Sequence, residues 1–200
     1  MGYSTRFETL DVTFFNQLGV NINDITQTQI TQILDGMKKY DIVKVSEATM
    51  YLADLIVESN YFKVLELEPD NTYINKLGNT EKEDITKYTG RGYIKLIGKQ
   101  NYELAEKSLK LKLIDTPSLA SVKENAAIIS AWWWSQGNPH TKEIKQTASI
   151  GSYTAFQRTM SLITCYDKDS KNCRTVNLNN KENVWFKMLD LLEISSTTNL

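Results

Sequence analysis

The chain has 200 residues, of which 41% are hydrophobic and 24% are charged, and its net charge at pH 7 is −1. This length is enough for one domain with a sizeable core, and we expect residues 1–200 to form it. The balanced charge excludes the electrostatic footprint of a protein that binds nucleic acid or an anionic membrane, and no apolar run is long enough to span a bilayer.

The hydrophobic pattern predicts a mostly helical protein. A first helix begins after a cap at Asp24 or Thr26, and a second, mostly buried helix covers 47–57 with Ser46 as its N-cap. Residues 66–92 hold few apolar residues and several glycines, which is typical of a long functional loop with room for a short hairpin. Further helices are expected at 102–111, 125–135, 155–165 and 184–192.

The helix at 125–135 is apolar almost all round, which predicts the central buried helix of the fold. It carries Trp132, Trp133 and Trp134. We interpret each of them as a core residue. At helical spacing only some can face inward, which leaves room for one to stack on a ligand ring.

Carboxyl groups gather around the end of the second helix. Glu58 follows the apolar run directly, and Glu66 and Glu68 follow after a short step. A carboxyl group held against apolar surface has a raised pKa, which suits a general acid, whereas a lone glutamate at a helix end is more often simply solvated. Further on, the Gly-Arg-Gly segment 90–92 allows close backbone approach, and Arg91 within it can bind a carboxylate bidentately. Together these features point to hydrolysis of a glycosidic bond, since that reaction needs one protonated and one ionised carboxyl group.

The cysteine and histidine content argues against a metal site. Cys165 and Cys173 flank the polar loop 166–172, and a disulfide or two free thiols fit the sequence equally well. His140 is the only histidine, so two cysteines have too few further ligands for structural zinc. We interpret His140 as an ordinary loop residue and expect no metal.

Ordered blocks of the sequence resemble glycoside hydrolase family 19, which includes chitinases and phage endolysins. Residues 58–62, Glu-Ser-Asn-Tyr-Phe, resemble the family's Glu-Ser-Gly-x-Phe, and 77–80, Leu-Gly-Asn-Thr, match its Leu-Gly-Asn-Thr. Residues 88–94, Tyr-Thr-Gly-Arg-Gly-Tyr-Ile, resemble Tyr-Lys-Gly-Arg-Gly-x-Ile, and the next blocks are Asn-Tyr at 101–102 and Ala-Trp-Trp-Trp at 131–134. The resemblance extends over roughly residues 22–160, and several blocks in the same order are far more specific than one short motif.

The resemblance implies a role for each matching position. Glu58 falls on the family's general acid, Glu66 and Glu68 bracket its general base, and Arg158 falls on the arginine that bridges the two carboxylates. Family members work by inversion, so the acid protonates the leaving oxygen while the base activates a water on the opposite face, with the carboxyl groups ~6.5–9.5 Å apart. The positions implied to bind saccharide are Ser59, Tyr88, Arg91, Tyr93, Lys95, Asn101 and Ser149.

Four positions depart from the family pattern. Val57 replaces a common His, Lys95 stands at a saccharide-binding Gln, Ile97 stands where a Ser or Thr helps to hold the attacking water, and Ser-Ile-Gly at 149–151 replaces Asn-Gly-Gly. Ile97 cannot hydrogen-bond a water. These departures keep a second hypothesis open, namely a saccharide-binding or structural domain that has lost catalysis.

The resemblance implies a mostly α, lysozyme-like domain with two helical lobes around a saccharide cleft. It also implies cleavage of β-1,4 bonds in an N-acetylglucosamine polymer, and we expect a monomer that uses no cofactor. Peptidoglycan is the first expectation for the substrate and chitin the second, because residues 1–6 show no signal peptide and secreted chitinases usually carry one together with more cysteines. We expect the protein to remain cytoplasmic until it is released or delivered to the cell wall or periplasm.

Overall fold

The structure is a computed structural model, in which residue 7 and the ranges 10–166 and 176–193 are described. The regular elements of these ranges are nearly all helical, including two 3₁₀ helices, η1 and η2, and one π-helix, η3. In chain order they are α2 (Val12–Gln17), α3 (Gln27–Lys39), α4 (Val45–Glu58), η1 (Asn71–Tyr73), α5 (Lys82–Lys87), α6 (Lys99–Leu109), η2 (Pro117–Ser121), α7 (Lys123–Trp132), η3 (Trp133–Gly137), α8 (Thr141–Ala148), α9 (Tyr153–Ile163) and α10 (Leu178–Leu191).

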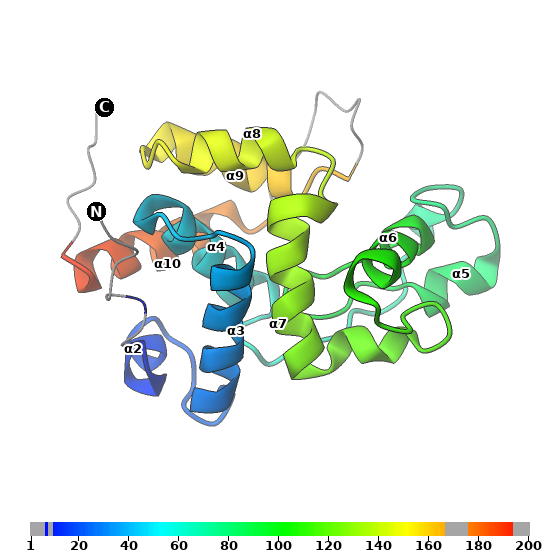
Figure 1. Ribbon diagram of the computed structural model, residues 1–200, viewed down its shortest axis with the longest axis horizontal. Coiled ribbons are helices and arrows are strands. Elements are labelled where there is room, and N and C mark those ends of the chain that lie inside the picture. The colour runs from blue at the N-terminus through cyan, green and yellow to red at the C-terminus, as the bar shows by residue number, and fades with distance from the viewer. Residues whose placement is uncertain (1–6, 8–9, 167–175, 194–200) are drawn as a thin grey trace.

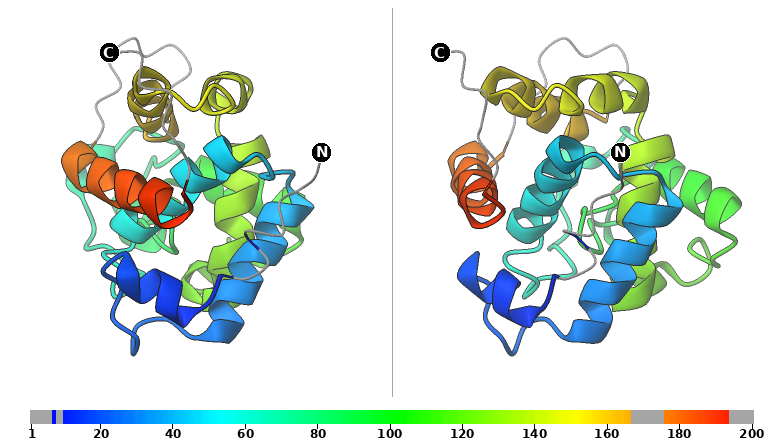
Figure 2. Two further views of the ribbon diagram at one scale, coloured as in Figure 1. Left: turned by 90° about the vertical axis from the view of Figure 1, so that its left-hand side faces the viewer. Right: turned by 60° about the vertical axis from the view of Figure 1, so that its left-hand side comes forward.

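Two groups of helices lie on either side of α7 (Figure 1). The smaller group holds α5 and α6, and the larger group holds α2, α3, α4 and α8 to α10. Helix α3 packs along α7, α8 lies beside α9, and α10 lies against α4 (Figure 2). This arrangement confirms the predicted mostly helical fold.

Helix α4 is the most deeply buried element, because every residue from 47 to 57 is buried. A helix that is apolar on all sides is stabilised by tertiary packing, and its few polar groups need partners inside the protein. Trp134 Nε1 donates to Glu47 Oε1 at 3.0 Å, and Trp185 Nε1 donates to Thr49 Oγ1 at 3.2 Å. The buried tryptophans thus contribute both apolar area and hydrogen bonds to α4.

The tryptophans of the central helix belong to the core. Trp132, Trp133 and Trp134 are at most 2% exposed. The helix itself ends earlier than predicted, at Trp132, and continues as the π-helical turn η3. The ring of Trp132 occupies the space beside Gly137, where an added Cβ would lie 2.6 Å from a ring atom. The core interpretation of all three residues is therefore confirmed.

The helix starts test the predicted caps. Thr26 caps α3 and forms a reciprocal capping box with Gln29, which selects Thr26 over Asp24. Helix α4 begins at Val45 after an extended Lys44, so the prediction that Ser46 is its N-cap is wrong. Packing on all sides holds this helix without a side-chain cap.

The segment predicted as a long loop at 66–92 contains more structure than the sequence indicated. It includes η1 and the short helix α5, which begins with a capping box between Glu81 and Asp84. Residues 88–98, which follow α5, are all buried. A short hairpin at 91–96, formed by backbone hydrogen bonds in both directions between Arg91 and Leu96 at 2.9 and 3.0 Å, lies at the end of the predicted segment and mostly beyond it.

No helix in the described ranges is long and apolar enough to cross a bilayer.

Candidate active site

The chain reverses direction immediately after α4 through a left-handed turn. All three residues at 60–62 have positive φ, between 48° and 67°. Such residues cost roughly 1–2 kcal/mol each, so the turn needs support from its surroundings. Ser59 provides it, because its Oγ accepts a hydrogen bond from Phe62 N at 2.9 Å and donates to a carbonyl in the last turn of α4. Glu58 and Glu66 lie on the two sides of this turn.

Glu58, the last residue of α4, forms an ion-paired triad with Asp54 and Lys181. Asp54 precedes it by one helical turn, and Lys181 comes from the first turn of α10. Lys181 Nζ lies 2.7 Å from Asp54 Oδ1 and 2.6 Å from Glu58 Oε1. The side chains of Lys181 and Asp54 are 0% and 1% exposed, whereas that of Glu58 is 19% exposed. Glu58 is therefore the member that reaches the surface.

Burial and neighbouring charges act in opposite directions on the pKa values of Asp54 and Lys181. It raises the pKa of Asp54 to about 6, an effect that Lys181 opposes and the charge of Glu58 reinforces. Burial would lower the pKa of Lys181, but the two carboxyl groups outweigh it and raise that pKa. One ammonium group thus lies between two carboxyl groups, those of Asp54 and Glu58.

The side chain of Glu66 is held by Arg91, and not by the predicted Arg158 on α9. Backbone hydrogen bonds from Leu67 N to Gly90 O and from Gly92 N to the carbonyl of residue 65 flank an isolated antiparallel bridge between Glu66 and Arg91. The two residues are thus a non-hydrogen-bonded cross-strand pair, whose side chains lie close together on one face. Arg91 Nη2 accordingly donates to Glu66 Oε1 at 2.8 Å.

Arg91 is itself rigidly held, which fixes the direction in which it presents its guanidinium group. Its Nη1 donates to Lys87 O at 2.7 Å and to Tyr102 Oη at 3.2 Å, and its side chain is only 8% exposed. The Glu66 side chain is 49% exposed. The structure therefore offers one carboxyl group in a mostly buried triad and a second that is open to solvent and oriented by a buried cation.

Lys95 lies between the hairpin at 91–96 and the segment that leads to Glu66. Its Nζ donates to Gly92 O at 3.0 Å and also contacts Val64 O, so it ties the hairpin to the segment that leads to Glu66. Burial lowers the pKa of Lys95 to about 8, and the charge of Glu58 acts in the opposite direction. Lys95 thus lies within electrostatic reach of Glu58 while it holds the backbone beside Glu66.

Two predicted catalytic residues lie elsewhere. Arg158 on α9 pairs with Glu143 on α8, with Nη2 at 2.6 Å from Oε1, and both side chains are about half exposed. The predicted bridge from Arg158 to the two candidate carboxyls is therefore not formed, because the α8–α9 packing brings Arg158 to Glu143 instead. Glu68 is exposed, and its backbone carbonyl accepts a hydrogen bond from Thr89 Oγ1 at 3.4 Å. Its side chain forms no ion pair with another described residue.

The residues predicted to bind saccharide are mostly packed inside the protein. Ser59, Tyr88, Tyr93 and Lys95 are at most 4% exposed, and Asn101 is 6% exposed. Tyr93 packs edge-on against Phe62, with ring centroids 5.1 Å apart. Asn101 Nδ2 donates to Ile97 O at 2.8 Å, and Ser149 Oγ donates to Gln146 O at 2.8 Å. These contacts are structural, and the binding roles of the seven positions stay predictions.

Ile97 is buried, with 7% exposure, beside the hairpin that carries Arg91. Its backbone carbonyl has a partner in Asn101, but its side chain offers no polar group, as the sequence indicates. His140 lies in the turn before α8, which agrees with its interpretation as a loop residue. Cys165 is disulfide-bonded, and Cys173 lies outside the described residues. The described residues contain no cluster of three or more metal-binding side chains.

Asp54 and Lys181 were not identified as site residues from the sequence, although each leaves a recognisable signal there. Asp54 interrupts the apolar run of α4, and Lys181 occupies the first position of the buried face of α10, in step with Val184, Trp185 and Met188. A charged residue at an apolar helical position implies a buried partner. Which partner it has depends on how α4 and α10 pack, and no local pattern contains that information.

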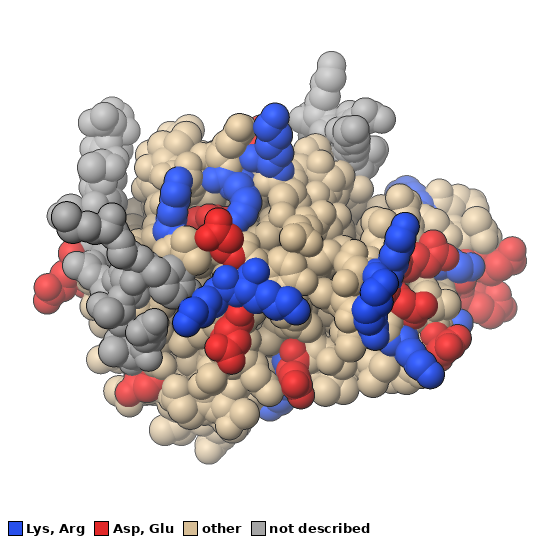
Figure 3. All heavy atoms as spheres, in the orientation of Figure 1, with Lys and Arg blue, Asp and Glu red and all other residues tan. Residues whose placement is uncertain are grey.

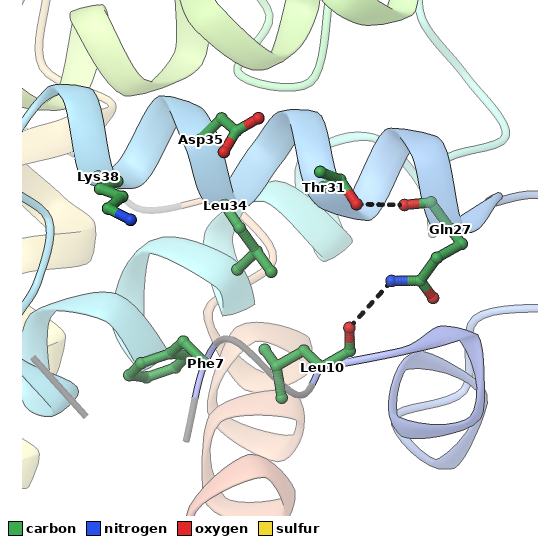
Figure 4. Close-up of a pocket in the computed structure, with 7 residues that line it drawn as sticks. All are labelled: Phe7, Leu10, Gln27, Thr31, Leu34, Asp35 and Lys38. Carbon is green, nitrogen blue, oxygen red and sulfur yellow. Dashed lines mark hydrogen bonds between the residues drawn. The ribbon is translucent and has the colours of Figure 1, made fainter. Parts of the chain in front are cut away.

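A pocket of about 250 Å³ lies apart from these residues, between α3 and the segment at Phe7 and Leu10 (Figure 4). Gln27 Nε2 crosses one end of it to donate to Leu10 O at 3.2 Å. None of the predicted site residues lines it. On the face shown in Figure 3, acidic and basic side chains are interspersed, in keeping with the net charge of −1.

No family model matches the chain. The chain is 31% identical over 86 residues to a glycosyl hydrolase family 19 domain-containing protein of Haemophilus influenzae. That match covers 42% of this chain and 42% of the other protein, so it spans less than half of the relative's length.

Solved structures of chitinases share the fold over nearly the whole chain. A bacterial family 19 chitinase has a TM-score of 0.71 and 18% identity, covering 95% of this chain and 97% of that one. Chitinase C from Streptomyces griseus HUT6037 has a TM-score of 0.64 and 17% identity, covering 100% and 82%. A class IV family 19 chitinase from Zea mays has a TM-score of 0.65 and 15% identity, covering 96% of each chain. The chain therefore has the fold of the family 19 chitinases, and its sequence resembles glycoside hydrolase family 19.

Proposed function

We propose that the protein is a glycoside hydrolase that cleaves β-1,4 bonds in an N-acetylglucosamine polymer. The observation that carries this proposal is the contrast between its two carboxyl sites. Glu58 belongs to the mostly buried triad with Lys181, whereas Glu66 is half exposed and paired with Arg91 at 2.8 Å. Glycosidases need this contrast, since one carboxyl group must carry a proton while the other is ionised.

In the proposed reaction Glu58 donates its proton to the glycosidic oxygen as the bond from that oxygen to the anomeric carbon breaks. A water oxygen bonds to the anomeric carbon from the opposite face, and its proton passes to Glu66. Solvent then returns a proton to Glu58 and takes one from Glu66. Arg91 takes the part that the sequence assigned to Arg158, because it is the cation that orients the base.

The substrate class divides into two candidates with the same bond chemistry. The count of only two cysteines favours peptidoglycan, because secreted chitinases usually carry more, and the fold shared with proteins named chitinases favours chitin. Purified protein is therefore assayed on chitin oligosaccharides and on peptidoglycan in parallel. Release of reducing ends from either polymer supports the proposal, and proton NMR of the first product shows whether the anomeric configuration is inverted.

A saccharide-binding domain without catalysis is the competing function, and the buried apolar side chain of Ile97 favours it. The same assays separate the two. Saturable binding of chitin oligosaccharides, without release of reducing ends over a long incubation, contradicts the enzyme and supports the binding domain.

A further inference from the structure

Lys95 is a buried lysine without a carboxylate partner. It is 4% exposed and forms no ion pair with another described residue. Its Nζ instead donates to two backbone carbonyls, those of Val64 and Gly92. Taking an ammonium group out of water is costly, and a neutral side chain of similar shape avoids that cost. The feature that a lysine adds at this position is therefore its pair of hydrogen bonds.

The first of these hydrogen bonds reaches the turn that follows the candidate acid. This turn begins after Glu58 and is closed at Val64, whose N–H donates to Ser59 O at 2.9 Å. The carbonyl of the same Val64 accepts from Lys95. Val64 is thus joined to the end of α4 through its N–H and to the hairpin through its carbonyl, and two residues later the chain reaches Glu66.

The second hydrogen bond reaches the pairing that holds the candidate base. Lys95 Nζ donates to Gly92 O at 3.0 Å, and Gly92 N donates to the carbonyl of residue 65 at 2.9 Å. Arg91, the neighbour of Gly92, holds the carboxyl group of Glu66. Lys95 therefore connects the turn after the candidate acid with the backbone pairing that carries the candidate base.

We propose that Lys95 is a positioning residue that sets the separation between the carboxyl groups of Glu58 and Glu66. The inference rests on the proposed function, in which these groups are the acid and the base. Their separation matters because an inverting enzyme must admit a water beside its base, and ~6.5–9.5 Å between the carboxyls leaves room for it. This role differs from saccharide binding, which the resemblance implies at position 95, because both hydrogen bonds of the ammonium group go to carbonyls of the protein itself.

The test removes the two hydrogen bonds and keeps an unbranched side chain of similar length. Lys95→Met is expected to lower kcat about tenfold or more, because misplaced catalytic groups lose much of the advantage of positioning, and to change KM by less than about twofold. Release of reducing ends from whichever polymer the protein cleaves measures both constants. A residue that binds saccharide uniformly raises KM when it is lost. A parent value of kcat, or a rise in KM alone, overturns the inference.

Lys145→Met is the matched control, because Lys145 also joins two backbone carbonyls but does so between α8 and the loop before α4. Its Nζ donates to Asp41 O at 2.8 Å and to Tyr40 O at 3.4 Å, and it pairs with Glu47 at 3.3 Å. The control is expected to lose stability in urea and to keep the parent kcat. An equal loss of kcat in both variants would be explained by destabilisation, and it overturns the inference.

Hydrogen exchange followed by NMR supplies a readout that does not require catalysis. The amides of Leu67 and Gly92 donate across the pairing of 65–67 with 90–92. In Lys95→Met their exchange, relative to that of amides in α4, is expected to quicken about tenfold or more, because a charge-assisted hydrogen bond that supports the pairing is lost. The control variant leaves this ratio at the parent value. An unchanged ratio in Lys95→Met overturns the inference.

Lys95→Gln decides the question if circular dichroism shows that Lys95→Met is unfolded. Its amide can donate, but the side chain is one bond shorter, so the same changes in kcat and exchange are expected at smaller size. Parent values of both overturn the inference.

The two proposals fail in distinguishable ways. Faster exchange of the two reporter amides in a Lys95 variant, in a protein that cleaves neither polymer, supports the connection made by Lys95 and contradicts the proposed function. An active protein in which Lys95→Met changes neither kcat nor exchange supports the proposed function and contradicts the role of Lys95.

Discussion

Arg91 and Glu66 face each other across an isolated antiparallel bridge, and their side chains meet at 2.8 Å. The backbone pairing therefore places the two side chains close enough to form the ion pair. Because Arg91 Nη1 also donates to Lys87 O and Tyr102 Oη, the exposed carboxyl of Glu66 is attached to a buried cation that is anchored by its second amino group. The candidate base is thus positioned by the sheet-like pairing of residues 65–67 with 90–92.

Replacing Glu58 with Gln is expected to remove activity and to preserve the fold. The amide retains the shape but has no proton of the required acidity, so a loss of about 10²-fold or more in kcat is expected. Release of reducing ends from the better substrate measures it. Glu103→Gln, at an exposed position on α6, is the matched control and keeps the parent rate. A Glu58→Gln enzyme with the parent rate means that Glu58 is not the acid.

Glu66→Gln is expected to cost far more activity than Glu68→Gln. Only Glu66 pairs with Arg91, whereas Glu68 is exposed and uses its backbone carbonyl in its contact with Thr89. A general base contributes roughly 10²–10⁴-fold to the rate, so its loss lowers the rate by that factor. The Glu68 variant is the control with the same chemical change. Larger loss in Glu68→Gln would move the base there. Equal small losses would contradict a role for either carboxylate in activating water.

Arg91→Met and Arg158→Met are expected to differ in stability. Arg91 makes charge-assisted hydrogen bonds from a buried site, and its loss is expected to lower the free energy of unfolding by about 2–3 kcal/mol. Arg158 forms a half-exposed pair with Glu143, so its loss is worth about 0–1 kcal/mol. Urea unfolding monitored by circular dichroism measures both. A larger loss in Arg158→Met would contradict the assignment of Arg91 as the structural anchor.

Ile97→Thr is expected to raise a low parent activity by about tenfold, or ~1.4 kcal/mol in the barrier. The hydroxyl restores a group that can hold the attacking water, and positioning of reactants is a large share of catalysis. Ile97 is buried, so the variant is also expected to lose about 1–3 kcal/mol of stability for the added polar group. Ile97→Val is the control that shortens the side chain without adding a hydroxyl. Equal activity in the Thr and Val variants would show that the hydroxyl is not what limits the reaction.

The raised pKa of Asp54 predicts how stability depends on pH. The folded pKa is about 6 against an ordinary value of 3.8, so the folded state binds more protons than the unfolded state in this window. The contribution of Asp54 is fully present below pH 4 and is lost as pH rises toward 6, with a magnitude on the order of 1–3 kcal/mol. Asp54→Asn is therefore expected to flatten the fall in stability between pH 4 and 6. Urea unfolding of both proteins across this range measures the slope, and identical slopes would contradict the raised pKa.

Local patterns predicted the parts of the fold that depend on local chemistry. The apolar run of α4 and the capping pattern at Thr26 determine helices without reference to the rest of the chain, and both are present. Helix α5 was missed because it is six residues long and lacks an apolar face of its own, as it buries only Asp84 and Ile85. The turn at 60–62 was also beyond prediction, since left-handed backbone is unfavourable for a bulky Tyr or Phe and arises from the support of Ser59.

The candidate site likewise contains residues that the sequence identified and contacts that it did not. Glu58 was identified because it opens a short motif after an apolar helix, Glu66 because it brackets the position of the base together with Glu68, and Arg91 by the glycines beside it. The pairing of Arg91 with Glu66 was not predicted, because the backbone register between two distant loops decides it. Arg158 was assigned from the resemblance alone, and the packing of α8 against α9 gives it a different partner.

The contact between Lys181 and Glu58 has a consequence for where the protein can be cut. The family resemblance ends near residue 160, well before α10 begins at Leu178. A fragment trimmed to the resemblance would keep both candidate catalytic carboxyls and lose the ammonium group between Asp54 and Glu58, together with the apolar helix that lies against α4. The smallest fragment that retains the chemistry therefore extends through α10, and its boundary is set by one buried charge.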